Sequence, residues 1–341
     1  KVDSRIQNPV LESVHQLNGV IQASLGHDNN MVWGAINDVF MDDFNNFEIF
    51  DELSVYEVAT FDENSALDLD SDVELAGGQA ETDVDDSGDS FWNTSVKLRH
   101  KFLNKKAGFQ WQNNLNMTLE SPFKLSYFDK QRVRLDSHVV KSMGEKWIIS
   151  GQVYYSRLTI GEDSVQSYKG IQPEINYLTP YGKFAARFDW VDKRFSADRL
   201  IWQDSRYYSK TLSWSKLFDQ QDLILSASLR FSKNDEQAEF TDDFTDDFAD
   251  DPVEYSTDSL SISALYRLNE GWDLHASAIT TKYDLVDRPS IRVDKITGTL
   301  SLRLSDAWKS FVSVEYNRID NAVTDVVEHR NVYQIGLSWH F

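Results

Sequence analysis

The sequence predicts an all-β fold, namely a transmembrane, antiparallel, up-and-down β-barrel of about 14 strands whose N and C termini are both periplasmic. Three observations indicate this fold. Apolar and polar residues alternate with a period of two in one segment after another. The connections between these segments are alternately short and long. Aromatic residues make up 13% of the chain, although its mean hydropathy is only -0.48.

Composition argues against a disordered chain and against a membrane protein built from helices. With 41% hydrophobic residues among 341, the chain has enough apolar surface to fold despite a net charge of -21. No apolar run approaches the ~18 residues that indicate a transmembrane helix. In a barrel, each strand alternates lipid-facing and lumen-facing residues, so the chain is hydrophilic on average. The absence of cysteine fits a barrel, because a closed hydrogen-bond ladder needs no disulfide.

The last segment, 331–341, shows the alternation most strictly. Every second residue from Tyr333 to Phe341 is apolar, and the residues between them are polar or glycine. A soluble edge strand of this kind would expose an aromatic, unprotected edge, which is an aggregation hazard. The spacing of four residues in this segment resembles the C-terminal assembly signal of outer-membrane barrels. These residues are Gln334, Gly336, Trp339 and Phe341. The resemblance implies that the barrel assembly machinery recognises the segment.

The same alternation, interrupted by turn residues, predicts the remaining strands. Their ranges are 18–27, 91–102, 107–120, 131–143, 146–158, 165–178, 183–194, 204–217, 222–233, 257–268, 271–283, 293–305 and 308–319. Residues 1–17 are then a periplasmic N-terminal segment, and residues 18–341 form the transmembrane barrel.

The connections favour a membrane barrel over a soluble β-sandwich. Every second connection is a tight turn, at 103–106, 144–146, 179–182, 218–221, 269–271 and 305–308. The intervening connections are longer, and two of them, 28–90 and 235–257, are long and acidic. Short periplasmic turns and long extracellular loops are typical of integral proteins of the bacterial outer membrane. A sandwich does not require this regular parity.

Aromatic residues mark both ends of the expected strands. One group lies beside the short turns: Trp147, Tyr181, Trp272 and Trp308. A second group lies toward the opposite ends: Tyr155, Trp190, Tyr207, Tyr208, Tyr283 and Tyr316. Two such planes are expected where a barrel meets the lipid headgroups on either side of the membrane.

The charged residues within the strands fall on the face opposite the apolar residues. We therefore expect them to line the lumen, where basic residues outnumber acidic ones. They are Lys97, Arg99, Arg134, Asp136, Arg187, Asp189, Arg230, Arg267, Asp273, Arg303 and Glu315.

The negative charge of the chain concentrates in the two long loops. Residues 241–252 read TDDFTDDFADDP, whose repelling carboxylates favour a solvated loop. The other interpretation is weak Ca²⁺ binding, since hard cations prefer oxygen ligands and bridge carboxylates to lipopolysaccharide phosphates. The candidate ligands are Asp83, Asp85, Asp242, Asp243, Asp246 and Asp247. An EF-hand reading of the first loop is weak, because Thr94 stands where the bidentate Glu belongs. No other cofactor is expected.

Catalytic motifs are lacking. The chain has no HExxH, GxSxG or Walker-type motif and no cysteine nucleophile. Asp136, His138 and Ser142 share an expected lumen face, but i, i+2 and i+6 span roughly 20 Å along one strand. We therefore expect neither an enzyme nor a nucleic-acid partner.

Both ends of the chain resemble those of known barrels. Ala23–Met31 and Tyr316–Phe341 resemble the barrel domains of surface lipoprotein assembly modifiers and exopolysaccharide-export proteins. The residues that carry the resemblance are Gly26, His27, Asp28, Asn29, Asn317, Asp320, Arg330 and Asn331.

This resemblance implies a channel or export conduit that passes a polymer, polypeptide or solute across the outer membrane with periplasmic partners. Two alternatives stay open. One is a passive diffusion porin, and the other is a structural barrel whose acidic loops bind a surface protein or divalent cations. The loop 28–90 discriminates between them, because it would constrict the lumen if folded inward and form a receptor platform if folded outward.

Overall fold

The computed structural model describes residues 13–29, 88–104, 107–124, 129–161, 163–196, 205–218, 222–236, 255–269, 271–285, 290–321 and 326–341. Within these residues the regular secondary structure consists of strands, which are joined by turns and loops. Among the same residues no helix is long and apolar enough to span a membrane. The strands are β1 (Ser13–Asp28), β2 (Asp89–Asn104), β3 (Phe109–Pro122), β4 (Lys130–Met143), β5 (Trp147–Ile160), β6 (Asp163–Thr179), β7 (Gly182–Phe195), β8 (Ser205–Phe218), β9 (Leu223–Glu236), β10 (Tyr255–Arg267), β11 (Trp272–Leu285), β12 (Ile291–Arg303), β13 (Trp308–Asn321) and β14 (Val326–His340).

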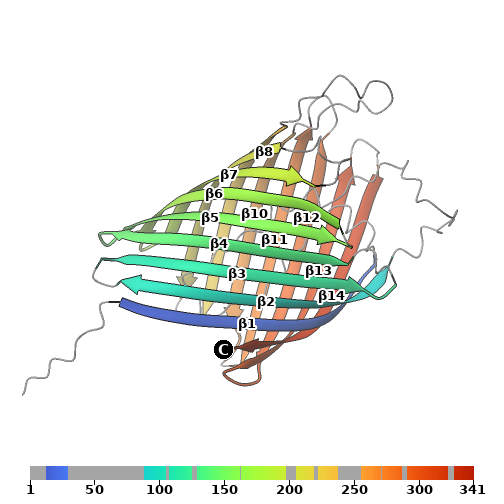
Figure 1. Cartoon of the computed structure of the whole chain (residues 1–341), viewed down its shortest axis with the longest axis horizontal. Coiled ribbons are helices and arrows are strands. Elements are labelled where there is room, and N and C mark those ends of the chain that lie inside the picture. The colour runs from blue at the N-terminus through green and yellow to red at the C-terminus, as the bar shows by residue number, and fades with distance from the viewer. Residues whose placement is uncertain are drawn as a thin grey trace, which may run out of the picture.

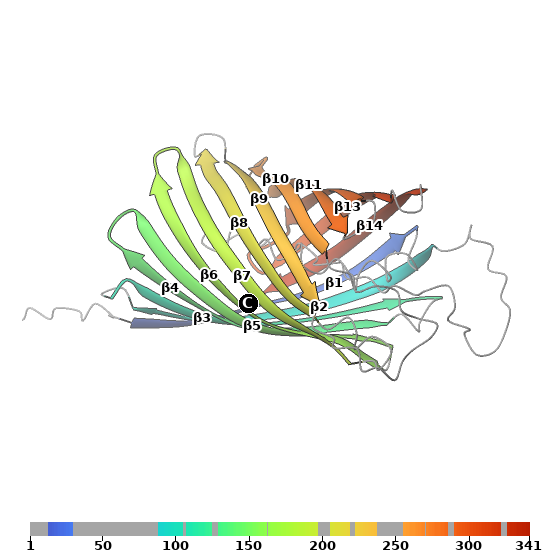
Figure 2. The same ribbon diagram turned by 90° about the horizontal axis from the view of Figure 1, so that it is seen from above.

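These strands close into one antiparallel barrel. Each strand pairs with its neighbours in the sequence, and β14 pairs with β1 to complete the ring. Figure 1 shows the strands strongly tilted around the barrel, and Figure 2 shows the ring of strands turned by 90°. The prediction of an all-β, antiparallel, up-and-down barrel is therefore confirmed, and each predicted strand overlaps an observed one.

The parity of the connections is also observed. Strands β2 and β3, β4 and β5, and the other pairs joined by tight turns meet at one rim, which we call the short-turn rim. The opposite rim, which we call the long-loop rim, carries the connections from β1 to β2 and from β9 to β10. Two connections at the long-loop rim are shorter than expected, because only residues 161–162 join β5 to β6 and only residues 322–325 join β13 to β14. Gly161 has a φ of 60°, a left-handed conformation that glycine adopts without strain.

Both ends of the described barrel lie at the short-turn rim. Ser13 pairs with Asn104 at the end of β2, and Phe341 exchanges backbone hydrogen bonds with Gly19. Because β1 starts at Ser13, residues 13–17 belong to the first strand instead of to a separate N-terminal segment. That the short-turn rim faces the periplasm stays a prediction from the fold class.

The two faces of each strand differ in polarity. Outward side chains are mostly large and apolar, as with Leu25, Val153 and Ile262. Their neighbours along each strand point inward and are mostly polar, as with Ser24, Gln152 and Ser261. An apolar outer band around a closed hydrogen-bond ladder is what the hydrocarbon core of a membrane requires, since no backbone group is left unpaired in lipid.

The expected aromatic girdles need one correction. Tyr208 lies on the outward face of β8, whereas Tyr207 is only 1% exposed and points inward. Tyr283 is also buried on the inward face, where it packs against Tyr255. Tyr207 and Tyr208 cannot both face the lipid, because adjacent residues of a strand point to opposite faces. Tyr207 and Tyr283 therefore belong to the lumen wall.

Candidate functional site

The structure places all of the expected lumen residues on the inward face. Each of them has the same parity as buried residues of its own strand. The expected lumen residues are Lys97, Arg99, Arg134, Asp136, Arg187, Asp189, Arg230, Arg267, Asp273, Arg303 and Glu315. Part of the basic charge is neutralised within the wall. Arg267 Nε lies 3.5 Å from Asp273 Oδ1, and Arg230 Nη2 lies 4.0 Å from Asp189 Oδ2.

Sequence reasoning missed several carboxylates of this wall, among them Asp89, Glu120 and Glu174. Arg187 Nε donates a hydrogen bond of 2.8 Å to Glu174 Oε2, across the β6–β7 pairing. Glu174 shares its parity with the buried Gln166 and Asn176, and this parity was the signal that would have identified it.

Charge is distributed unevenly along the barrel axis. In the long-loop half of the wall, acidic and basic inward residues are nearly balanced. In the short-turn half, basic residues clearly outnumber Glu174 and Asp273, the inward carboxylates there among the described residues. The basic residues are Lys97, Arg99, Lys101, Lys183, Arg187, Arg267, Arg303 and Lys309. We call this set the basic mouth.

The long-loop half of the lumen wall carries unexpected apolar side chains, some of which pack in three separate clusters. These side chains are all buried and point inward, although the lumen side of a membrane barrel is usually polar. We call this set of side chains the apolar collar; it consists of Phe91, Leu158, Ile160, Tyr168, Val191, Tyr207, Tyr255, Tyr283, Ile319 and Val332.

Cations lie over the aromatic rings of the collar. The Lys193 ammonium is 5.9 Å from the Tyr168 ring centre and 5.5 Å from that of Tyr207. The Arg230 guanidinium is 5.3 Å from the Tyr207 ring. Since cations within about 6 Å of an aromatic face are attracted to it, these contacts help to hold basic side chains inside the barrel.

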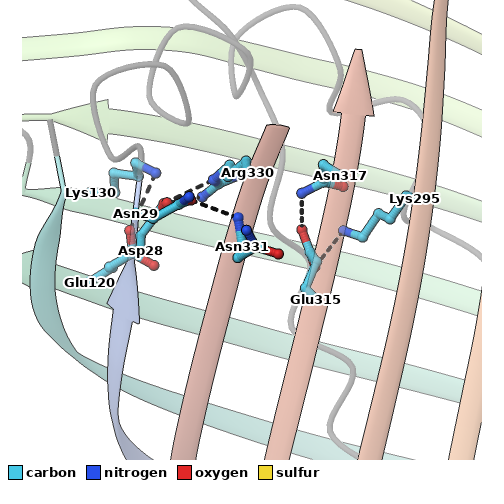
Figure 3. A network of polar contacts seen from close by, with 9 residues as sticks. All are labelled: Asp28, Asn29, Glu120, Lys130, Lys295, Glu315, Asn317, Arg330 and Asn331. Atoms are coloured by element: carbon cyan, nitrogen blue, oxygen red, sulfur yellow. Dashed lines mark hydrogen bonds and ion pairs between the residues drawn. The ribbon is translucent and has the colours of Figure 1, made fainter. Parts of the chain in front are cut away.

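A network of polar residues joins the two ends of the chain (Figure 3). The Nε and Nη2 atoms of Arg330 on β14 donate hydrogen bonds of 2.8 and 2.6 Å to Asp28 Oδ2 on β1. The backbone N–H of Asn331 donates to Asn29 Oδ1 at 2.7 Å, and the Asn29 N–H donates to the Asn331 carbonyl at 3.2 Å. Residues near opposite ends of the sequence thus lock the β1–β14 seam.

The network continues away from the seam. Asn317 Nδ2 donates to Glu315 Oε1 at 2.6 Å, and Lys295 Nζ lies 2.8 Å from Glu315 Oε2. On the other side of the seam, Lys130 and Glu120 form an ion pair of 3.3 Å. Several of the residues that carry the family resemblance, among them Asp28, Arg330 and Asn317, are therefore brought together at the long-loop end of the wall.

The proposed assembly-signal residues all lie on β14 or directly after it. Gln334 is buried on the inward face, while Trp339 and Phe341 are exposed on the outward face. A Cβ built on Gly336 would lie 2.6 Å from the Ala23 carbonyl oxygen and from the Phe311 ring. Glycine is thus required for close packing at the seam, and the role of these residues in assembly stays a prediction.

The candidate calcium ligands Asp83, Asp85, Asp242, Asp243, Asp246 and Asp247 lie outside the described residues. Within the described ranges, no group of three or more His, Asp or Glu side chains is arranged to hold a metal ion. Asp136, His138 and Ser142 share the inward face of β4, as their spacing predicts. Asp136 accepts a hydrogen bond of 2.7 Å from Asn114 Nδ2.

The comparisons with known proteins agree with this architecture. Neither a protein-family model nor a curated protein sequence matches the chain. The in-vitro folded OmpT, an outer membrane protein of Vibrio cholerae, is similar with a TM-score of 0.50 and 6% identity, covering 97% of this chain and 98% of that one. The chain has the fold of an outer-membrane β-barrel. Its apolar outer band and closed ladder make it an integral protein of the outer membrane.

Two further solved structures are similar over the same length but less close in shape. A bacterial polysaccharide outer membrane secretin has a TM-score of 0.46 and 10% identity, covering 95% of this chain and 98% of that one. An anion-selective porin from Comamonas acidovorans has a TM-score of 0.42 and 12% identity, covering 97% of this chain and 100% of that one. At such identities, likeness extends to the fold alone.

Proposed function

We propose that this barrel is an outer-membrane channel or export conduit that admits negatively charged cargo, whether a polymer, a polypeptide or a solute, at the basic mouth. The observation that supports this function is the excess of inward basic residues in the short-turn half of the strands. Fixed cationic groups on a low-dielectric wall concentrate anions and favour their passage over that of cations.

We infer the direction of transport from the orientation that is expected for the fold class. Short turns of outer-membrane barrels lie in the periplasm, so the basic mouth would face that compartment. Cargo would therefore enter from the periplasm, where a partner protein would present it. A passive diffusion porin would share the same selectivity, but it would pass small anions without a partner.

Ion selectivity in planar bilayers tests this proposal. The purified barrel should favour anions in a salt gradient, and Lys97→Glu combined with Lys101→Glu and Lys183→Glu should shift the reversal potential toward cations. The matched control is Lys141→Glu with Lys216→Glu, whose side chains have the outward parity of their strands near the same rim. A cation-selective wild type, or an equal shift in the control, would contradict the proposal.

A second candidate function is a structural or docking barrel, which the apolar collar favours. Phe91 and Tyr207 are each 1% exposed and Gln166 is 0% exposed, so these side chains of the long-loop half are covered by other groups. If the wild type shows no conductance at any salt concentration, and Phe91→Ala with Tyr207→Ala opens none, the docking function replaces the channel.

A further inference from the structure

Charged residues also occur on the outer surface of the barrel, where lipid is the surrounding medium. They occupy outward positions in the long-loop halves of β5 to β13, and we call them the charged belt. Each shares its parity with exposed apolar residues of the same strand. Lys210, for example, lies two residues from Leu212, which is 56% exposed.

The first part of the belt runs across four adjacent strands. Lys169 on β6 lies directly opposite Asp192 on β7, which lies opposite Arg206 on β8, and Arg206 lies opposite Asp235 on β9. Lys233 forms an ion pair with Asp235 along β9. Opposite charges on directly opposed residues attract, so the row is ordered by its own contacts.

The second part repeats this arrangement on later strands. Lys282 Nζ lies 2.6 Å from Asp284, Arg292 Nε lies 3.1 Å from Asp294, and Arg318 Nη2 lies 3.6 Å from Asp320. The basic side chains of these pairs are 55%, 61% and 46% exposed. An ammonium has three N–H donors and a guanidinium has five, so one carboxylate does not saturate them.

The belt covers only part of the circumference. The outward strand positions in the long-loop halves of β14 and β1 to β4, among the described residues, carry no Lys, Arg, Asp or Glu. Residues such as Trp92, Leu119 and Val133 stand there instead. General contact with water at the rim does not account for such a restriction, because it would favour charge all around the barrel.

The level of the belt identifies the chemistry that surrounds it. Most of its members lie beside or beyond the outward aromatic residues Tyr155, Trp190 and Tyr208, which mark the interface of the membrane. Lys210 lies two residues from Tyr208 on the short-turn side. Charges are costly in hydrocarbon but favourable at the headgroup level. Basic residues outnumber acidic ones in the belt, so its net attraction is for anions at that level.

We propose that the charged belt binds the phosphate groups of lipid in the outer leaflet of the outer membrane. The basic side chains donate hydrogen bonds to phosphate oxygens, and the carboxylates hold those side chains along the strands. Charge-assisted bonds from Arg and Lys to phosphate are the strong class of hydrogen bond. This inference rests on the outer-membrane location and on the orientation expected for the fold class, with the long-loop rim outside, and not on channel function.

Native mass spectrometry of the full chain with lipid A tests the belt. The probes are lipid A with both phosphates and the same lipid A after dephosphorylation. Each basic residue near an anionic surface adds to the attraction, so the wild type should prefer the phosphorylated form by about tenfold or more. Lys169→Gln, Arg206→Gln, Lys210→Gln and Arg292→Gln together should abolish that preference.

Two controls accompany this variant. Lys97→Gln, Lys101→Gln, Lys183→Gln and Lys309→Gln remove as many basic groups from the inward face and should leave the lipid preference intact. Exchanging Lys and Arg at the four belt positions keeps their charge and should also retain it. If the combined glutamine variant does not fold, judged by heat-modifiable migration, Arg206→Gln alone should still lower the preference.

Equal retention of both lipids by the wild type, or an unchanged preference in the glutamine variant, would overturn the proposal. Competition by free inorganic phosphate separates the two phosphate sources. The lipid should stay bound, because its acyl chains also contact the outer band, and displacement by free phosphate would show that the site takes soluble anions instead. Conductance is read separately, so failure of the belt and failure of the channel are distinguishable.

Discussion

Removing one partner of the ion pair between Arg330 and Asp28 should destabilise the barrel far more than removing one partner of an exposed ion pair does. The side chains of Arg330 and Asp28 are only 4% and 1% exposed, and two guanidinium nitrogens contact the same carboxylate oxygen. Arg330→Met keeps an unbranched, uncharged side chain at this position but leaves the Asp28 carboxylate buried without this guanidinium. Removing one partner of a buried pair costs about 3–5 kcal/mol in the free energy of unfolding.

A double-mutant cycle in lipid vesicles measures this contribution. Urea unfolding followed by tryptophan fluorescence compares Arg330→Met, Asp28→Leu and the double variant. The double variant should lose less stability than the sum of the single variants, because it leaves neither charge stranded. The control is Lys282→Met, since Lys282 and its partner Asp284 are 55% and 44% exposed and such pairs contribute about 0–1 kcal/mol.

Two results would refute this reasoning. One is a loss of stability for Arg330→Met no larger than that for Lys282→Met. The other is strict additivity in the cycle, which would mean that the two side chains act independently and that the seam is held by backbone pairing alone.

The remaining predictions concern assembly, topology and the outer loops. Deleting Phe341, or replacing Gly336 by Leu, should leave the protein unfolded in the periplasm, since a side chain at Gly336 would collide with the Ala23 carbonyl and the Phe311 ring; normal heat-modifiable migration of either variant would contradict this. A cysteine at Asp246 should react with an impermeant maleimide on intact cells and one at Glu145 should not, and the reverse pattern would invert the orientation. Deleting residues 238–254 should increase anion selectivity at low salt, where screening is weak; an unchanged reversal potential would show that this loop does not act on the mouth.

Strand positions were predictable from sequence because each strand carries its own local signal. Period-two alternation is imposed by two different media, lipid outside and a polar lumen inside, so it persists in every strand without reference to its neighbours. The tight turns were equally local. The expectation of a longer connection between β5 and β6 was wrong. Gly161 permits a tight turn there, and the alternation of apolar and polar residues does not show where a strand ends.

The inward or outward direction of single aromatic residues was less predictable. Tyr207 and Tyr208 follow one another, and both fit a girdle by composition and by distance from the turns. Their parity within β8 separates them, since Tyr207 aligns with the buried Ser205 and Ser209. The apolar collar was missed because apolar residues were assumed to face the lipid, whatever their parity within the strand.

The sequence by itself determined that the chain forms a closed antiparallel barrel with an apolar outside, a charged inside and two kinds of rim. These properties follow from local alternation and turn chemistry. Only the tertiary structure decided which charges meet, because register between strands and closure of β14 on β1 bring together residues that are far apart in sequence. Arg330 and Asp28, 302 residues apart, became a buried pair only through that closure. The grouping of the charged belt on β5 to β13 likewise required the register of those strands.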